Sequence, residues 1–478
     1  MKATTTCGSS KARVTVAMLA LGGLTEAERQ LEAKLCKLEK KRDSVGVLRL
    51  EAGALALVNK LREGNPAAAG CILNVLGLCH YRTGDFARAC ELHEEHRAIW
   101  EALGDSAQVG KACGNLGICY FSLGQYARAR ELHEQEMALT EASEDPEGFA
   151  GACGNLGNCY HGMGDHVRAR ELHEQRRAIC ESLGDRAGVA GACGNLGVSY
   201  YSTGDYARAR EMHEQHMATS KALGNRAAVA MACGNLANCH ARVGDYRRAC
   251  ELHHKDREIC EALGDRAGVA GACGNLGNSY LNLGDYAAAI SYYKKEYSMA
   301  EQMQVQTELA GAAMGIGVAL RLGGRLNVTE CAAGAADELP GACAAEKWLE
   351  TALALGYPIA RLHLARLAFD LGEEQKALAH LQGYLSTCVE QGPNFCNGCG
   401  QTRGNDAPML TCAGCRVARF CSAEHQKMAS RGASSGGCLV LGRHKDACGL
   451  LGMWRQQVVK DGAAPEALRA ELLAFLRR

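Results

Sequence analysis

The chain has 478 residues, of which 47% are hydrophobic, so it can bury a large core and is not a disordered protein. Its 53 basic and 53 acidic residues give a formal net charge of zero. This argues against a nucleic-acid partner, because binding a phosphate backbone needs a basic surface. No apolar run approaches the ~20 residues that span a bilayer, so we expect no membrane span.

Residues 1–44 are expected to form a helical lead into the rest of the chain. The segment carries Lys2, Lys11 and Arg13 and an apolar stretch at residues 14–21, a pattern that a targeting peptide would also show. No clear cleavage site follows this stretch, and the alternative of a targeting peptide stays open.

Residues 45–322 contain an internal repeat with a period of forty residues. The block CGNLG starts at Cys113, Cys153, Cys193 and Cys273, and the variant CGNLA starts at Cys233. Each copy holds two helical patterns separated by a Gly-Asp turn, in which glycine suits the left-handed end of one helix and aspartate caps the next. Because one helical hairpin cannot bury its own apolar face, the copies must stack. The sequence predicts an all-α fold, a right-handed helical solenoid.

The repeat resembles the tetratricopeptide repeat at five positions of its third copy: Leu156, Gly157, Tyr160, Gly164 and Ala169. Its length and the segments GNLGN and ARELHEQRRAI are similar to the Leu-Gly-Asn repeats of the Pins-type G-protein signalling modulators. The resemblance implies a solenoid that binds protein or peptide partners in its concave groove. No GoLoco-type motif follows the repeats, so a role with G proteins is not implied.

Most of the repeated cysteines and histidines are expected in the core. Nine of the 26 cysteines recur in two columns, which we interpret as small buried side chains: Cys113, Cys153, Cys193, Cys233 and Cys273, and Cys79, Cys119, Cys159 and Cys239. Free thiols predict a reducing compartment, which we take to be the cytoplasm, with the nucleus as the alternative. We assign the histidine column to helix packing rather than catalysis: His93, His133, His173, His213 and His253.

Beyond the repeats, residues 323–345 are rich in Ala, Gly and Cys and are expected to form a linker. Helical patterns resume at residues 347–355, 359–371 and 374–385. The last two predict a further tetratricopeptide-like pair within residues 346–390. A metal-binding module is expected at residues 396–448, and a helical tail at 449–478.

Eight potential zinc ligands occur in closely spaced pairs, which is the pattern of a strong zinc signal. Two-residue gaps let paired cysteines wrap one ion. The pairs are Cys396 with Cys399, Cys412 with Cys415, Cys421 with His425, and His444 with Cys448. With four protein ligands for each ion no position is left for a catalytic water, so we expect the zinc to be structural.

The ligand order, Phe420 before Cys421 and Gln426 after His425 resemble the MYND finger. The resemblance implies two interleaved Zn²⁺ sites, one formed by Cys396, Cys399, Cys421 and His425 and the other by Cys412, Cys415, His444 and Cys448. His425 stands where the family usually has cysteine, and an insertion precedes His444. Cys438 lies in that insertion, and its use as a ligand stays open.

For the repeats we predict a peptide-binding wall made of two asparagine columns on the first helices. Positions three apart share one helix face, and a carboxamide can both donate to and accept from a peptide backbone. The first column is Asn115, Asn155, Asn195, Asn235 and Asn275, and the second is Asn158, Asn238 and Asn278. The alternative is that these side chains pack or hydrogen-bond between helices.

The chain is therefore expected to be a non-enzymatic adaptor or scaffold. MYND fingers and tetratricopeptide helices also occur beside SET domains, so a lysine methyltransferase relative is the enzymatic alternative. No SET signature is found, and no nucleophile beside a base is recognised. A scaffold that binds no short peptide is the second alternative.

Overall fold

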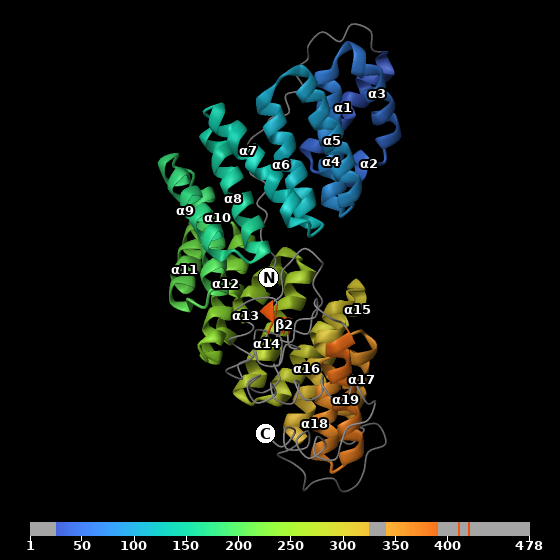
Figure 1. The fold of residues 1–478 in the computed structure, drawn as a ribbon, viewed down its shortest axis with the longest axis vertical. Helices are drawn as coiled ribbons and strands as arrows, with labels where there is room; N and C mark the ends of the chain where they lie inside the picture. Colours follow the sequence, from blue (N-terminus) through green and yellow to red (C-terminus); the bar gives the residue numbers. More distant parts are fainter. Residues whose placement is uncertain (1–24, 325–340, 391–409, 412–418, 421–478) are drawn as a thin grey trace. The chain divides into compact units, whose positions relative to one another are not determined.

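The structure is a computed structural model that describes residues 25–324, 341–390, 410–411 and 419–420. The chain divides into two compact units, Met1–Ser199 and Tyr200–Arg478. Helices stacked in antiparallel pairs make up nearly all of the described residues (Figure 1), which confirms the predicted helical-repeat solenoid.

In the first unit, three helices precede the repeats: α1 (Glu26–Lys40), α2 (Ser44–Leu48) and α3 (Glu51–Gly64). The repeat helices follow, with the unit boundary inside the last of them: α4 (Pro66–Thr83), α5 (Phe86–Leu103), α6 (Ser106–Ser122), α7 (Tyr126–Ala142), α8 (Pro146–Met163), α9 (His166–Ser182) and α10 (Arg186–Ser202). Each helix from α4 to α8 packs against the next. The first helices of successive repeats also meet, α4 with α6 and α6 with α8.

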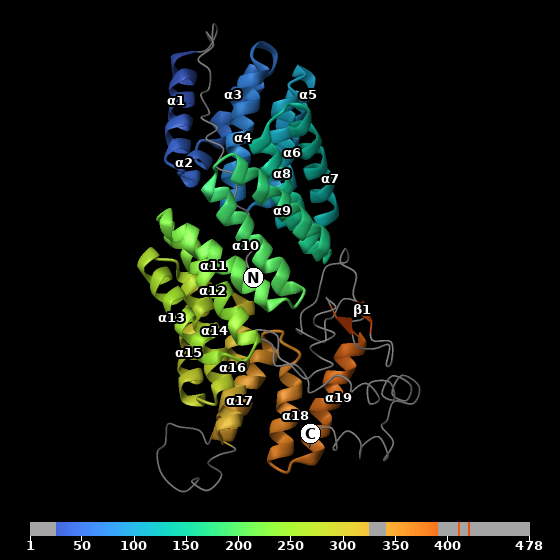
Figure 2. The ribbon, with the colours of Figure 1, turned by 90° about the vertical axis from the view of Figure 1, so that its left-hand side faces the viewer.

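The second unit continues the same alternation (Figure 2). Its repeat helices are α11 (Tyr206–Ala222), α12 (Arg226–Arg242), α13 (Tyr246–Leu263), α14 (Arg266–Leu283), α15 (Tyr286–Met303) and α16 (Gln306–Gly324). Three further helices are α17 (Gly341–Ala354), α18 (Ala360–Asp370) and α19 (Glu374–Glu390). Consecutive helices pack from α11 to α19, and α16 also meets α18.

The Gly-Asp turns form the predicted caps. Gly164 ends α8 with a left-handed φ of 87°, and Asp165 then accepts from the Arg168 amide at the start of α9. Glycine takes this φ without a steric penalty, whereas a β-carbon would be strained there. The same pair recurs at Gly84 and Asp85. Periodic breaks in the helices therefore come from local sequence.

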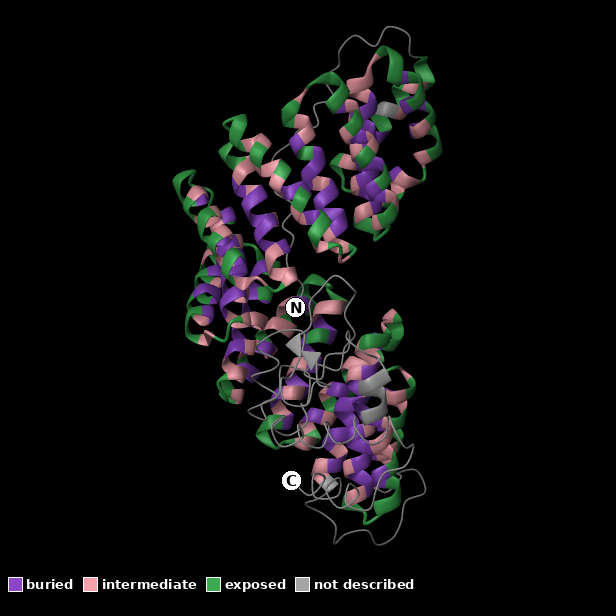
Figure 3. Ribbon diagram, viewed as in Figure 1, coloured by how far each residue is buried: buried purple, intermediate pink, exposed green. Residues whose placement is uncertain are grey.

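The core consists of small side chains between closely packed helices, and buried residues line the facing sides of the helices in Figure 3. All nine column cysteines are buried, as predicted. So are the five column histidines, with exposed fractions of 0–1%. Each of His93, His133 and His173 lies against a glycine of the preceding helix: Gly77, Gly117 and Gly157.

Helix α17 begins at Gly341, inside the range expected to be linker. Its first turns, GACAAEKW, are rich in alanine, the best helix former, so glycine and cysteine nearby did not prevent a helix. Two short strands, β1 (Leu410–Thr411) and β2 (Arg419–Phe420), pair antiparallel, with Leu410 opposite Phe420. Among the described helices, none is both long and apolar enough to cross a membrane.

Candidate peptide-binding wall and zinc module

The eight predicted asparagines all lie on first helices of the repeats. In the first unit, α6 carries Asn115, α8 carries Asn155 and Asn158, and α10 carries Asn195. In the second unit, the residues are Asn235 and Asn238 on α12 and Asn275 and Asn278 on α14. Asn158 and Asn195 are buried, each with an exposed fraction of 7%, and the other six are half-buried. A half-buried carboxamide can still reach a bound peptide.

In the first unit, asparagines from neighbouring repeats bind one another. Asn195 donates through Nδ2 to Oδ1 of Asn158 at 3.2 Å, and Asn115 donates to Oδ1 of Asn74 at 2.8 Å. Each bond links two consecutive first helices, α8 to α10 and α4 to α6. Asn115, Asn158 and Asn195 therefore hydrogen-bond between helices, which was the alternative to peptide binding.

In the second unit the asparagines are held differently. The buried Tyr293 of α15 donates its hydroxyl proton to Oδ1 of Asn278 at 2.7 Å. This bond fixes the orientation of the carboxamide and leaves its Nδ2 group as a donor. Within the residues that the structure describes, the side chains of Asn235 and Asn238 make no hydrogen bond. The second unit thus keeps polar groups that a peptide backbone could use.

Two features beside the asparagines were not predicted from the sequence. Asn74 and Tyr293, their hydrogen-bond partners, depart from the repeat consensus, which has glycine and histidine at those positions. The glycines four positions before Asn155 and Asn275 border open space, because a β-carbon on Gly151 or Gly271 would meet no atom within 4 Å. The departures from consensus and the recurring glycine were the signals available in the sequence.

A second line of glycines, directly before the asparagines, contacts ionisable side chains from the second helices. The contacts are Gly114 with Glu136, Gly154 with Arg176, Gly234 with Asp256 and Gly274 with Glu296. Burial raises the pKa of Asp256 to about 6. Burial, with a smaller effect of Glu308, raises the pKa of Glu296 to about 8. The wall of the second unit therefore has weakly acidic carboxyl groups beside its asparagines.

The column histidines have the properties of core residues. Burial lowers the pKa of His93, His173, His213 and His253 to about 3 in each case. A histidine with so low a pKa is a poor general base near neutral pH. The rings are also enclosed by helix packing, so these residues fill the core.

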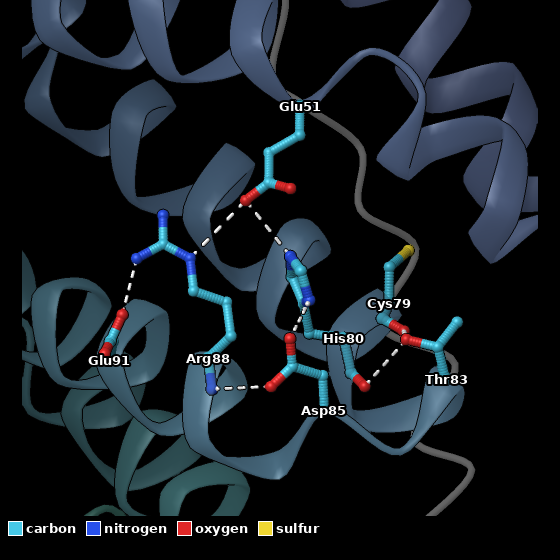
Figure 4. Close-up of polar contacts among 7 residues, drawn as sticks. All are labelled: Glu51, Cys79, His80, Thr83, Asp85, Arg88 and Glu91. Atoms are coloured by element: carbon cyan, nitrogen blue, oxygen red, sulfur yellow. Dashed lines mark hydrogen bonds and ion pairs between the residues drawn. The ribbon is translucent and has the colours of Figure 1, made fainter.

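A polar cluster joins α3 to the first repeat (Figure 4). His80 of α4 lies with Nε2 3.1 Å from Oε1 of Glu51 and with Nδ1 3.3 Å from Oδ2 of Asp85. The Nε of Arg88 lies 3.5 Å from the same Glu51 oxygen, and its guanidinium also pairs with Glu91. Because both ring nitrogens of His80 face carboxylates, the cluster fastens helices together and leaves neither nitrogen directed at a nucleophile.

The eight predicted zinc ligands lie outside the described residues: Cys396, Cys399, Cys412, Cys415, Cys421, His425, His444 and Cys448. Cys438 lies outside them as well. The neighbouring strands are described. Because β1 and β2 are antiparallel, the chain leaves them at opposite ends of the ladder, and the next residues in the sequence are Cys412 and Cys421.

Comparison with known families agrees with this architecture. The family described as Tetratricopeptide repeat matches residues 68–142, 150–222 and 226–302, and a second model of that description matches residues 358–382. The MYND finger family matches residues 396–435. This last match contains six of the predicted ligands and ends before His444 and Cys448.

Solved structures with the same fold are distant in sequence. One is a signal transduction ATPase with numerous domains with a tetratricopeptide repeat sensor from Pyrococcus horikoshii. It is 14% identical, with a TM-score of 0.51 over 74% of this chain and 49% of its own. Another is the apo form of the quorum sensor NprR from B. thuringiensis, 11% identical, with a TM-score of 0.51 over 70% of this chain and 89% of its own. No curated protein matches the chain in sequence.

The fold and the repeat positions define a tetratricopeptide-like helical-repeat solenoid. The chain carries tetratricopeptide repeats followed by a C-terminal MYND finger. A MYND finger implies zinc binding, and tetratricopeptide repeats indicate protein or peptide partners.

Proposed function

We propose that the protein is a non-enzymatic adaptor that binds an extended peptide segment along the first helices of its second unit. The observation that carries this proposal is the set of asparagines on α12 and α14. Asn238 and Asn235 make no side-chain hydrogen bond within the described part of the chain, and Tyr293 orients Asn278 with its Nδ2 group as a donor. Gly271, beside open space, gives a backbone room to approach.

A peptide in extended form needs partners for its own amide and carbonyl groups, because it has no neighbouring strand. Carboxamides spaced along the solenoid supply both donors and acceptors. We also propose that the repeats are of the Leu-Gly-Asn, Pins-like type, because that resemblance implies the same use of the asparagines. Asn115, Asn158 and Asn195 have a structural role in the first unit, where they hold adjacent helices together.

The proposal is tested with the full-length chain and a phage library that displays random peptides. We expect peptides selected on the wild type to bind the double variant Asn238→Ala with Asn278→Ala at least tenfold more weakly, at an unchanged Tm. The matched control is Asn74→Ala with Asn115→Ala, which removes a carboxamide pair that serves helix packing. The control should lower the Tm and leave peptide affinity near the wild-type value.

Three results would contradict the proposal that a peptide binds along these first helices. These are no selected peptide at all, equal affinity of the asparagine variant, or a loss of stability as large as that of the control pair. The first would favour a scaffold that binds no short peptide. Methyltransferase activity on histone or peptide lysines would instead support the enzymatic alternative.

For the MYND finger we propose two structural zinc ions. One is bound by Cys396, Cys399, Cys421 and His425, and the other by Cys412, Cys415, His444 and Cys448. Support comes from the antiparallel β1 and β2, which lead directly into Cys412 and Cys421 from opposite ends of the ladder. That direction suits ligands of two different ions. A second partner would then bind the surface of the stabilised module, and free thiols suit a cytoplasmic protein.

A further inference from the structure

Two histidine rings meet at the turn that joins the two helices of the third repeat. His161 lies in the last turn of α8, and His166 is the first residue of α9. Their Nδ1 atoms are 3.2 Å apart, and their ring centroids are 4.8 Å apart with an angle of 53° between the ring planes. Both residues are half-buried, so a small ion from solvent can reach the pair.

Three other repeats have a pair of carbon rings at the same two positions. The pairs are Tyr81 with Phe86, Phe121 with Tyr126, and Tyr201 with Tyr206, and their ring centroids are 5.4, 5.2 and 5.5 Å apart. These rings pack on each other at the turn and have no nitrogen that could bind a metal. The third repeat has two imidazoles instead, which can bind metal ions. Ring packing at this turn therefore does not need histidine.

The two nitrogens have the separation of two ligands on one metal ion. Nitrogens bound at about 2.0 to 2.1 Å to one ion are about 2.9 Å apart at right angles and about 3.3 Å apart in a tetrahedral arrangement. The observed 3.2 Å lies between these values. Rings that met head-on in a hydrogen bond of this length would have centroids about 5.5 Å apart, whereas rings that share an ion have centroids about 5 Å apart. The observed 4.8 Å fits the shared ion better.

The short turn between α8 and α9 holds the two rings in this relation. The amide of Gly164 donates to the His161 carbonyl at 3.0 Å, and the left-handed φ of Gly164 ends α8. Asp165 then accepts from the Arg168 amide at 3.2 Å, which sets the start of α9 at His166. Ligands that are already in place lose less conformational freedom when they bind an ion.

We propose that His161 and His166 form a chelating site for one divalent late transition-metal ion such as Zn²⁺, Ni²⁺ or Cu²⁺. Imidazole nitrogens favour these ions, whereas Mg²⁺ and Ca²⁺ favour oxygen ligands. Both Nδ1 atoms give a lone pair to the ion, and the proton that one of them carries leaves to solvent. In the described part of the chain no third His, Cys, Asp or Glu completes a metal-binding group, so water takes the remaining positions.

The test is equilibrium dialysis of the untagged, full-length, zinc-loaded chain against NiCl2, with nickel and zinc both measured by elemental analysis. We expect the wild type to bind one Ni²⁺ more per chain than His161→Phe or His166→Tyr, at unchanged zinc content. Losing one of two chelating ligands should weaken Ni²⁺ binding at this site about tenfold or more. Each substitution introduces the residue that the second repeat has at that position, Phe121 or Tyr126, so the variants should fold.

His240→Tyr is the matched control. His240 is also a half-buried histidine in the last turn of a first helix, α12, but its Nδ1 lies 3.3 Å from a carboxylate oxygen of Asp245 and not beside a second imidazole. The second, third, fourth and sixth repeats have tyrosine at this position, so this variant should fold as well. It should keep the additional Ni²⁺.

A second measurement locates the ion in the wild type itself. Diethyl pyrocarbonate modifies accessible imidazoles, and trypsin releases both histidines in residues 131–168, where fragmentation separates them from His133. We expect NiCl2 to protect His161 and His166 from modification and MgCl2 to leave them reactive. The proposal is wrong if the wild type and the two variants bind equal nickel, if nickel binds only as zinc is released, or if NiCl2 protects the pair no better than MgCl2.

Discussion

The imidazole of His173 lies directly against the backbone of Gly157, and a β-carbon added to this glycine would come within 2.6 Å of the ring. His173 has an exposed fraction of 1%, so neighbouring helices limit its movement. We predict that Gly157→Ala lowers the free energy of unfolding by about 1 to 3 kcal/mol, because the core must shift to accept the methyl group. Urea denaturation followed by far-UV circular dichroism measures this change.

Gly151 is the control in the same helix, α8. A β-carbon there would meet no atom within 4 Å, so Gly151→Ala should be neutral or raise stability by up to about 1 kcal/mol through helix propensity. The fifth repeat has Ala237 at the position of Gly157, opposite His253. A stack can thus adjust around one methyl group, which argues for the lower end of the expected loss. Equal losses from both alanine variants would disprove the packing explanation.

The buried histidines predict that acid destabilises the repeats. Burial, with smaller effects of Arg176 and His161, lowers the pKa of His173 to about 3, whereas an unfolded histidine titrates near 6.5. Between these two pKa values the His173 imidazole is protonated in the unfolded chain and neutral in the folded chain. Stability is therefore complete above about pH 6.5 and falls as the pH drops towards 3. Each such histidine should cost on the order of 2 kcal/mol between pH 7 and pH 5.

Comparing urea denaturation at these two pH values for the wild type and His173→Leu isolates one contribution. The variant should lose about 2 kcal/mol less than the wild type on acidification, whatever its stability at pH 7. Ala169→Gly in the same helix removes a buried methyl group without changing any titrating group. It should lower stability equally at both pH values. An unchanged pH dependence in His173→Leu would contradict the assignment.

Much of the fold follows from local sequence. The forty-residue period, the Gly-Asp turns at Gly164 and Asp165 and the columns of Cys and His predicted the helices and their buried faces, because each repeat uses the same residues for the same contact. The repeat period predicts only the contacts that all repeats have in common. Asn74, which breaks the consensus, accepts from Asn115, and Tyr293 replaces a column histidine and binds Asn278. Such partners depend on which side chains meet across a junction.

The start of α17 also depends on a tertiary contact that the local sequence does not reveal. Glycine and cysteine near Gly341 suggested irregular chain, yet α17 begins there. Leu349 of this helix packs against Gly317 of α16, and the core that contains Leu349 continues into α19. Burial on a neighbouring helix stabilises a segment whose composition alone is ambiguous. A single sequence contains no direct record of that contact.

The cluster around Glu51 should be needed to hold α3 on the first repeat. Glu51 faces His80 and Arg88, and its side chain is 24% exposed. We predict that Glu51→Ala lowers local stability by about 1 to 2 kcal/mol, because two cationic or donor groups lose their shared acceptor. Hydrogen exchange in α3 should become about tenfold faster or more. Glu91→Ala removes an ion pair with Arg88 whose carboxylate is 62% exposed, so it should have little effect.

The MYND finger leads to the last prediction, two zinc ions for each full-length chain. The eight proposed ligands would divide into two tetrahedral sets, and a segment this small is expected to depend on its metal to fold. Elemental analysis of the purified chain should give two ions, and Cys412→Ser should lose the ion that it shares with Cys415, His444 and Cys448. The helical signal of the repeats should be nearly unchanged, since the metal acts locally.

The Cys438→Ser variant tests whether Cys438 is a zinc ligand, because the family match ends at residue 435 and does not reach His444 or Cys448. If it loses an ion while Cys448→Ser keeps both, Cys438 is a ligand and our second set is wrong; one ion in the wild type would overturn both sets.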